Sequence, residues 1–204
     1  ARTAQHILGQ SDNTARNAAL SAAAAAIRAS EPEILSANQR DRACGADAGL
    51  TDAFIDRLTL TPESIEAMAQ GLDVIAQLYD PLGAELARWT VSTGLDITRI
   101  ATALGVIGVI YESRPNVTVD AASLCIKSGN AALLRCGSDS QHTSGLLASL
   151  MQSGLKEAGL PQASIQIIPT TDRHAVGAML AAAGEIDVII PRGGKGLVGR
   201  VQQE

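Results

Sequence analysis

The stretch from Asp187 to Val198 carries the strongest chemical signal in this chain of 204 residues. An apolar, β-branched run ends at Pro191, and three glycines and two cations follow before an apolar pattern resumes. Glycines let the backbone approach an anion, the free N–H groups at a helix start point toward it, and the cations add charge. The sequence therefore predicts a phosphate-binding turn, whereas a solvated basic turn is the alternative interpretation of a glycine-rich motif. The turn consists of Arg192, Gly193, Gly194, Lys195 and Gly196.

Two more polar turns follow short apolar runs. Glu112-Ser-Arg-Pro-Asn116 follows residues 106–111, and Arg135-Cys-Gly-Ser138 follows residues 131–134. If these runs are parallel strands, all three turns lie beyond the carboxyl ends of one sheet, where such sheets bind ligands. A solvated face explains one such turn better than it explains three. A Gly-x-Gly-x-x-Gly fingerprint does not follow the first strand, so a dinucleotide would have to be held in another way.

Elements with the alternation of an α/β domain must position these turns. Strands are predicted at 106–111, 131–134, 164–168 and 186–190, and helices at 117–127, 140–158 and 173–183. Gly129, Gly159 and Gly184 supply the left-handed residue that ends a helix. Short apolar strands alternating with helices predict a Rossmann-like parallel sheet with helices on both faces.

The segment before this sheet is predicted to differ in structure. Residues 1–86 read as helices, and the alanine run 22–26 is interpreted as a close-packed helix face. Residues 89–100 are rich in β-branched side chains around Gly94, which predicts a protruding hairpin. We therefore predict a helical part at 1–86, a hairpin region at 87–104 and an α/β core at 105–204.

Composition excludes several classes of function. The net charge is −5 and the pI is near 5.2, which argues against nucleic acid and anionic membranes as partners. The sequence contains neither an apolar run of membrane-spanning length nor an export signal. The three cysteines, Cys44, Cys125 and Cys136, have no close metal-ligand spacing, so we expect no metal site and a reducing, cytoplasmic location.

Three long motifs resemble one known family. They are the segments 105–122, 127–138 and 187–198, and the segment Asp56-Arg-Leu-Thr-Leu-Thr-Pro agrees with it as well. The chain resembles the γ-glutamyl phosphate reductases, also called glutamate-5-semialdehyde dehydrogenases, of the aldehyde dehydrogenase superfamily. The resemblance implies the cofactor-binding domain of that fold, with the hairpin at 87–104 serving oligomerisation.

The resemblance also implies an activity. The family reduces L-glutamate 5-phosphate to glutamate 5-semialdehyde and phosphate with NADPH, in the synthesis of proline from glutamate. A cysteine thiolate displaces the phosphate, and hydride from the nicotinamide follows. A homodimer and glutamate 5-kinase, as a pathway partner, are the implied associations.

Individual site residues follow from the same resemblance. Arg135 and Ser138 stand where the superfamily contacts the adenosine ribose. Serine tolerates a 2′-phosphate that a glutamate would repel, so NADP is the expected cofactor. Ser113, or Asn116 after a gap, stands at the oxyanion position, and Arg114 is a candidate for an acidic substrate group. The cofactor-binding set comprises Arg135, Ser138, Arg192, Gly193, Gly194, Lys195 and Gly196.

The chain departs from the family in length. Family members are about twice as long, and their nucleophilic cysteine lies in the second half, whereas this sequence ends at Glu204. Cys136 is next to Arg135, where a cation could lower its pKa, but it stands at the ribose end. We therefore expect no catalytic cysteine in this chain and no activity of the chain alone. The alternative is a standalone nucleotide-binding or oligomerising module.

Overall fold

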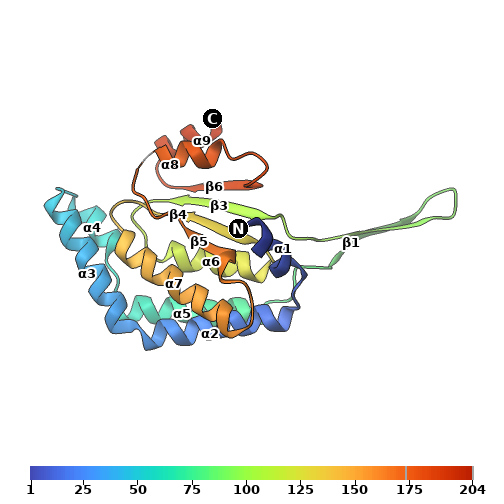
Figure 1. Ribbon diagram of the computed structural model, residues 1–204, viewed down its shortest axis with the longest axis horizontal. Helices are drawn as coiled ribbons and strands as arrows, with labels where there is room; N and C mark the ends of the chain where they lie inside the picture. The colour runs from blue at the N-terminus through green and yellow to red at the C-terminus, as the bar shows by residue number, and fades with distance from the viewer. Residues whose placement is uncertain (173, 204) are drawn as a thin grey trace.

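Four parallel strands form the centre of the molecule in the computed structural model, which describes residues 1–172 and 174–203. The sheet order is β5-β4-β3-β6. The strands are β3 (Val106–Tyr111), β4 (Ala131–Arg135), β5 (Ile165–Ile167) and β6 (Val188–Arg192). Every residue of β3 is buried, as expected for a central strand covered on both faces. The predicted α/β class, with helices on both faces, is confirmed (Figure 1).

The helices form unequal layers on the two faces of the sheet (Figure 1). On one face lie α6 (Val117–Lys127) and α7 (Gln141–Glu157), with α2 (Asn13–Ala29) and α5 (Pro62–Gln77) in a further layer behind them. The other face carries α8 (His174–Leu180) and α9 (Lys195–Gln203). The remaining helices are α1 (Arg2–Gln10), α3 (Glu31–Asp47), α4 (Asp52–Leu58) and the 3-10 turn η1 (Gln162–Ser164).

The alanine run of α2 forms a close-packed face against α7. Ala19, Ala23 and Ala24 are completely buried. A Cβ placed on Gly154 of α7 would meet the carbonyl oxygen of Ala19 at 2.5 Å and the backbone nitrogen of Ala23 at 2.7 Å. These partners are backbone atoms and cannot rotate away. The two helix backbones are therefore in direct contact, and this contact requires small residues on both sides.

We expect Gly154→Ala to lower the free energy of unfolding by about 1–3 kcal/mol, because the added methyl group forces the two helices apart. Gly145 on the same helix is the matched control, since a Cβ there meets nothing within 4 Å. Gly145→Ala should be neutral or stabilise the protein by up to about 1 kcal/mol through helix propensity. Urea unfolding of both variants measures the difference. Equal stability changes for the two variants would contradict the close contact.

The predicted hairpin is confirmed and starts earlier than expected. Strand β1 (Glu85–Thr90) pairs with β2 (Asp96–Ile100) in antiparallel register, and Gly94 has a φ of 85° in the turn. The hairpin extends away from the rest of the molecule (Figure 1). Apolar side chains on it remain accessible, with exposed fractions of 46% for Trp89 and 61% for Leu95.

The last strand and the helix before it differ from the prediction. The strand was predicted at 186–190 but spans Val188–Arg192, and Ile186 forms only an isolated bridge with Ala183. The Asp187 carboxylate accepts hydrogen bonds from the backbone of Val106 and from Arg2, which fixes the point where this strand joins β3. The strand therefore continues through Pro191. An edge position tolerates a proline, because it leaves one side of the strand unpaired within the described sheet.

The helix predicted at 173–183 spans only His174–Leu180, and Arg173 lies outside the described residues. Gly129, Gly159 and Gly184 all have positive φ, between 69° and 85°, as predicted for helix ends. None of the helices in the described ranges combines the length and hydropathy that a membrane crossing requires.

Candidate functional site

Two pockets open at the carboxyl edge of the sheet, where the three polar turns meet. The first, which we call the arginine pocket, has a volume of about 320 Å³. The second, which we call the β4 pocket, has a volume of about 490 Å³. The pockets share Phe54, Glu112 and Ser113, so the turn after β3 forms the wall between them. Two ligands bound at this edge would lie side by side.

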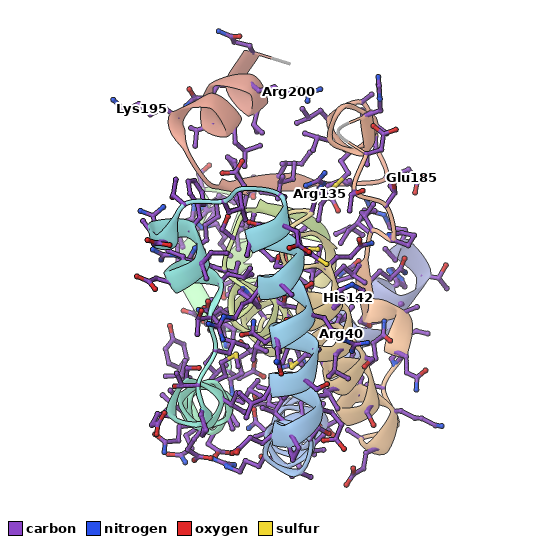
Figure 2. The ribbon with its side chains drawn as sticks, turned by 90° about the vertical axis from the view of Figure 1, so that its left-hand side faces the viewer. Arg40, Arg135, His142, Glu185, Lys195 and Arg200 are labelled. Atoms are coloured by element: carbon purple, nitrogen blue, oxygen red, sulfur yellow. The ribbon has the colours of Figure 1, made fainter. Side chains whose placement is uncertain are left out.

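The β4 pocket is built around the turn after β4. Its wall includes Arg135, Gly137, Ser138 and Asp139, together with Gly196 and Arg200 from the opposite side. Ser138 is exposed at this turn, whereas Arg135 is 8% exposed. Figure 2 shows Arg135 close to the sheet and Arg200 on α9 above it. A cation and an exposed hydroxyl on one turn can bind a polar or anionic group.

Arg135 already has several backbone partners. Its Nη1 donates to the carbonyl oxygen of Cys136 at 2.7 Å, and its Nη2 donates to that of Thr171 at 2.9 Å. Its Nε is buried and has no hydrogen-bond partner. These bonds tie the β4 turn to the loop that follows β5. The guanidinium therefore supplies fixed positive charge to the pocket, with few N–H groups left for a ligand.

A carboxylate from α3 orders the start of α7, directly after the β4 turn. The Asp41 oxygens accept hydrogen bonds from the backbone nitrogens of His142 at 3.0 Å and Thr143 at 2.7 Å. The Thr143 hydroxyl donates to the same carboxylate. Asp41 is 2% exposed, and an anion at this position satisfies free N–H groups of the helix. The position of the β4 turn is thus set by α3 as well as by the sheet.

Ser113 has a strained backbone between the two pockets. Its φ is 49°, the only positive value for a non-glycine residue in the described chain. Its hydroxyl donates to the Asp139 carboxylate in the β4 turn. A Cβ on Gly137 would meet the same carboxylate at 2.1 Å, so a larger residue there would displace the Asp139 side chain from Ser113. A left-handed conformation at a non-glycine residue is costly and is found preferentially at functional sites.

The arginine pocket brings together three guanidinium groups. Arg57 comes from α4, Arg114 from the turn after β3, and Arg192 from the end of β6. The carboxylate of Glu112 lies in the same wall and accepts a hydrogen bond from the backbone nitrogen of Gly194 at 3.2 Å. The turn after β3 is therefore bonded to both neighbouring turns. Ser113 reaches the β4 turn, and Glu112 reaches the glycine-rich turn.

The structure distributes the residues of the glycine-rich turn differently from the prediction. Arg192 is the last residue of β6 and lines the arginine pocket with Gly193 and Gly194, whereas Gly196 lines the β4 pocket. Lys195 lines neither pocket, and Figure 2 shows it at the outer side of α9. The single turn predicted from sequence thus contributes to two different pockets.

The candidates in the first turn also separate. Ser113 and Arg114 line the arginine pocket, but Asn116 does not. The Asn116 side chain donates to Asp120 at 3.1 Å within the first turn of α6. The sequence predicted no functional role for Arg57 or Glu112. The motif Asp56-Arg-Leu-Thr-Leu-Thr-Pro was the available signal for Arg57, but Arg57 is far in sequence from the turns after β3 and β6 with which it lines the pocket.

The cysteines do not form a nucleophilic centre. Cys125 and Cys136 are each 5% exposed, and Cys44 is exposed. Burial raises the pKa of the Cys125 thiol to about 12. Burial also raises the pKa of Cys136 above its ordinary value, and the opposing effects of Ser144 and Arg135 do not offset it. The lowering of the Cys136 pKa that Arg135 suggested in the sequence is therefore outweighed by desolvation.

We expect only Cys44 to react with iodoacetamide at pH 8 in the folded protein. The reaction of Cys125 and Cys136 should be slower by a factor of at least about 100, because little thiolate forms at a buried thiol. Mass spectrometry of peptides after timed alkylation gives the three rates, and the same reaction in urea provides the control in which all three thiols react. A native rate for Cys136 equal to that of Cys44 would contradict its burial.

In the part of the chain that the structure describes, histidines, cysteines and carboxylates do not gather in threes at a position that could hold a metal ion. His174 contacts Asp172 at 2.8 Å, and His142 takes part through its backbone nitrogen. The polar chemistry of this edge therefore consists of guanidinium groups, hydroxyls, backbone N–H groups and carboxylates.

Known proteins are similar to this chain in sequence and in fold. A model described as the aldehyde dehydrogenase family matches residues 1–204. Proteins named gamma-glutamyl phosphate reductase are 55% identical over 204 residues in Gluconobacter oxydans and 53% identical in Paramagnetospirillum magneticum. All of this chain is covered in both comparisons, but only 48% of each relative. The chain thus spans about half the length of the curated relatives it matches.

Two solved structures extend the similarity to three dimensions. The gamma-glutamyl phosphate reductase of Thermotoga maritima superimposes with a TM-score of 0.96 at 36% identity, over 99% of this chain and 49% of that one. The enzyme of the same name from Saccharomyces cerevisiae superimposes with a TM-score of 0.90 at 33% identity, over 98% of this chain and 51% of that one.

Proposed function

The chain belongs to the aldehyde dehydrogenase family, and we propose that it provides the cofactor-binding part of a γ-glutamyl phosphate reductase. The observation that carries this proposal is the match of the whole chain to reductases at 50–55% identity. The proposed reaction is the NADPH-dependent reduction of L-glutamate 5-phosphate to L-glutamate 5-semialdehyde and phosphate, a step of proline synthesis.

Bound NADPH would supply the hydride for this reduction. The part of the chain described here would bind and orient the ligands. Cys125 and Cys136 are buried, and the exposed Cys44 lines neither pocket, so these thiols are not suited to attack a carbonyl. We propose that the nucleophilic thiol comes from residues other than these 204. A cytoplasmic location is consistent with three free thiols.

The β4 pocket fits the ribose and phosphate end of a nicotinamide dinucleotide. Its volume of about 490 Å³ suits part of such a molecule, and its positive charge comes from the buried Arg135 and from Arg200. A Cβ on Gly196, in the first turn of α9, would meet nothing within 4 Å, so the start of this helix is open to a close-lying phosphate. Arg135, Ser138 and Gly196 are the residues that we propose to hold this end.

We propose a preference for NADP over NAD on grounds of charge. Ser138 is exposed at the mouth of the pocket and can donate a hydrogen bond to a 2′-phosphate, near the positive charge of Arg135. Asp139 lies in the same wall, but Ser113 already donates to its carboxylate. The pocket thus has a cation and a hydroxyl available for the extra phosphate.

We expect the unmodified chain to bind NADPH more tightly than NADH. Ser138→Glu should weaken NADPH binding by roughly tenfold while changing NADH binding little, because the new carboxylate repels only the 2′-phosphate. Fluorescence titration with each reduced cofactor measures both affinities. Ser138→Gln is the control for side-chain size without charge. Equal affinities for the two cofactors in the unmodified chain would refute the preference.

We propose that the hairpin mediates self-association into a dimer. Its two strands expose apolar side chains, among them Trp89 at 46% and Ile100 at 52%, and its outer edges have unpaired backbone groups. Edges of this kind pair with strands of other chains unless charge or proline prevents it.

Replacing Val91 and Ile97 with lysine should shift the chain from dimer to monomer without unfolding the parallel sheet. The charges act on the protruding hairpin, which lies away from the core (Figure 1). Light scattering over a concentration series measures the mass, and circular dichroism monitors the fold. Thr93→Lys, in the exposed turn, adds charge without removing an apolar side chain and should leave the dimer intact. A monomer at all concentrations in the unmodified chain would exclude the proposal.

A further inference from the structure

The arginine pocket joins Arg192, predicted from the sequence to bind the cofactor, with Arg114, predicted to contact an acidic group, and with Arg57, which had no predicted role. Arg57, Arg114 and Arg192 come from parts of the chain up to 135 positions apart, and the fold places them in one wall. The β4 pocket has its own cations, Arg135 and Arg200. The arginine pocket is therefore a second concentration of positive charge at the same edge, in a chain with a net charge of −5.

The three arginines of this pocket are exposed, and their guanidinium groups are not neutralised by a close carboxylate of the described chain. Arg2, Arg16 and Arg28 each contact a carboxylate at 2.6–2.9 Å. Among the described residues, no carboxylate lies within 4.0 Å of Arg57, Arg114 or Arg192. Three like charges gathered in one small pocket repel each other, and an anion between them would relieve that repulsion.

The carboxylates near the pocket leave an excess of positive charge. Glu112 lines the wall, but its carboxylate accepts a hydrogen bond from the backbone of Gly194 at 3.2 Å. Asp120 does not line the pocket and accepts from Asn116. Its pKa is raised by burial, although Arg192 acts in the opposite direction. Three cations therefore face one lining carboxylate, which suits a ligand with two negative charges.

The pocket has the size and the side-chain chemistry for a small oxyanion ligand. A volume of about 320 Å³ is enough for a molecule the size of an amino acid. A guanidinium presents a planar set of donors that matches a carboxylate or phosphate. The Arg57 guanidinium carbon lies 5.6 Å from the centre of the Phe54 ring, a stacking distance that restricts its orientation.

The arginine pocket lies next to Ser113, so a ligand bound in it would lie beside the β4 pocket. Ser113 lies in the walls of both pockets, so a molecule in the arginine pocket is adjacent to one in the β4 pocket. A reductase requires this neighbourhood of substrate and cofactor. We propose that the arginine pocket binds the oxyanion end of the substrate, a carboxylate or phosphate of a small acidic molecule, through Arg57, Arg114 and Arg192. The identification with the reductase substrate rests on the proposed function, whereas the oxyanion site itself does not.

Protection of arginines from phenylglyoxal tests the site directly. The unmodified 204-residue chain is treated with the reagent alone, with L-glutamate, with inorganic phosphate, or with NADP, and modification is measured per residue by mass spectrometry. We expect L-glutamate or phosphate to slow modification of all three pocket arginines several-fold. Arg42 on α3, which is exposed and lines neither pocket, should react at an unchanged rate. Higher salt should reduce the protection.

Matched variants distinguish the loss of a pocket arginine from a change in the net charge of the chain. Arg57→Gln or Arg114→Gln should lower the affinity for the protecting ligand by about tenfold, as expected for the loss of a charged hydrogen bond. Arg57→Lys should retain more of this affinity than Arg57→Gln, but not all of it. Arg42→Gln lowers the net charge equally and should leave the affinity unchanged. Circular dichroism confirms that each variant is folded.

The outcomes are distinct. Protection by glutamate alone identifies a carboxylate subsite, and protection by phosphate alone identifies a phosphoryl subsite. Protection of the three arginines by neither anion would overturn the proposal. Protection by NADP alone would also overturn it, because the pocket would then hold the cofactor's phosphates. If the chain binds no NADPH in the titration above while glutamate still protects, the cofactor assignment fails and the oxyanion site stands.

Discussion

The parallel pairing of β3 with both β4 and β6 is the constraint on which the candidate site depends. Because all three strands run in the same direction, the turns after Tyr111, Arg135 and Arg192 emerge at one edge. The register places Ile110 opposite Arg135 on one side and Pro191 on the other. A shift of one residue on either side would turn alternate side chains to the opposite face. The two pockets are therefore a consequence of strand register as much as of their lining residues.

Two side chains of the turn after β3 connect the turns that this register brings together. Ser113 donates to Asp139 in the β4 turn, and Glu112 accepts from Gly194 in the glycine-rich turn. A ligand that binds an N–H group of Gly194 competes with the Glu112 carboxylate, and a change at Asp139 acts on the strained backbone of Ser113. Because both residues line both pockets, a shift on either side of the sheet edge reaches the two pockets together. The two pockets are thereby linked through two adjacent residues.

Much of the fold could be read from the sequence because its signals are local. The strand at 106–111 and the helix at 117–127 have the predicted bounds. An apolar run marks the strand, and a helix-ending glycine marks the end of the helix. The extension of β6 to Arg192 was missed because a proline usually ends a strand, and only its edge position shows why it does not. The assignment of Arg192, Gly193 and Gly194 to one pocket and Gly196 to the other depends on contacts between segments far apart in the chain. The involvement of Arg57 and Glu112 was hidden for the same reason, because neither has a local pattern that indicates its partner.

The scarcity of aromatic residues has a practical consequence for the protruding hairpin. The chain contains a single tryptophan, and it is Trp89, 46% exposed on β1 and paired with Ile97 across the hairpin. The two tyrosines and the single phenylalanine lie elsewhere, and indole dominates the emission of a protein excited at its absorption edge. The intrinsic fluorescence of this protein is therefore a local reporter. It senses the polarity around one strand of the hairpin and is nearly silent about the core, so an unchanged emission spectrum during unfolding would not indicate an intact sheet.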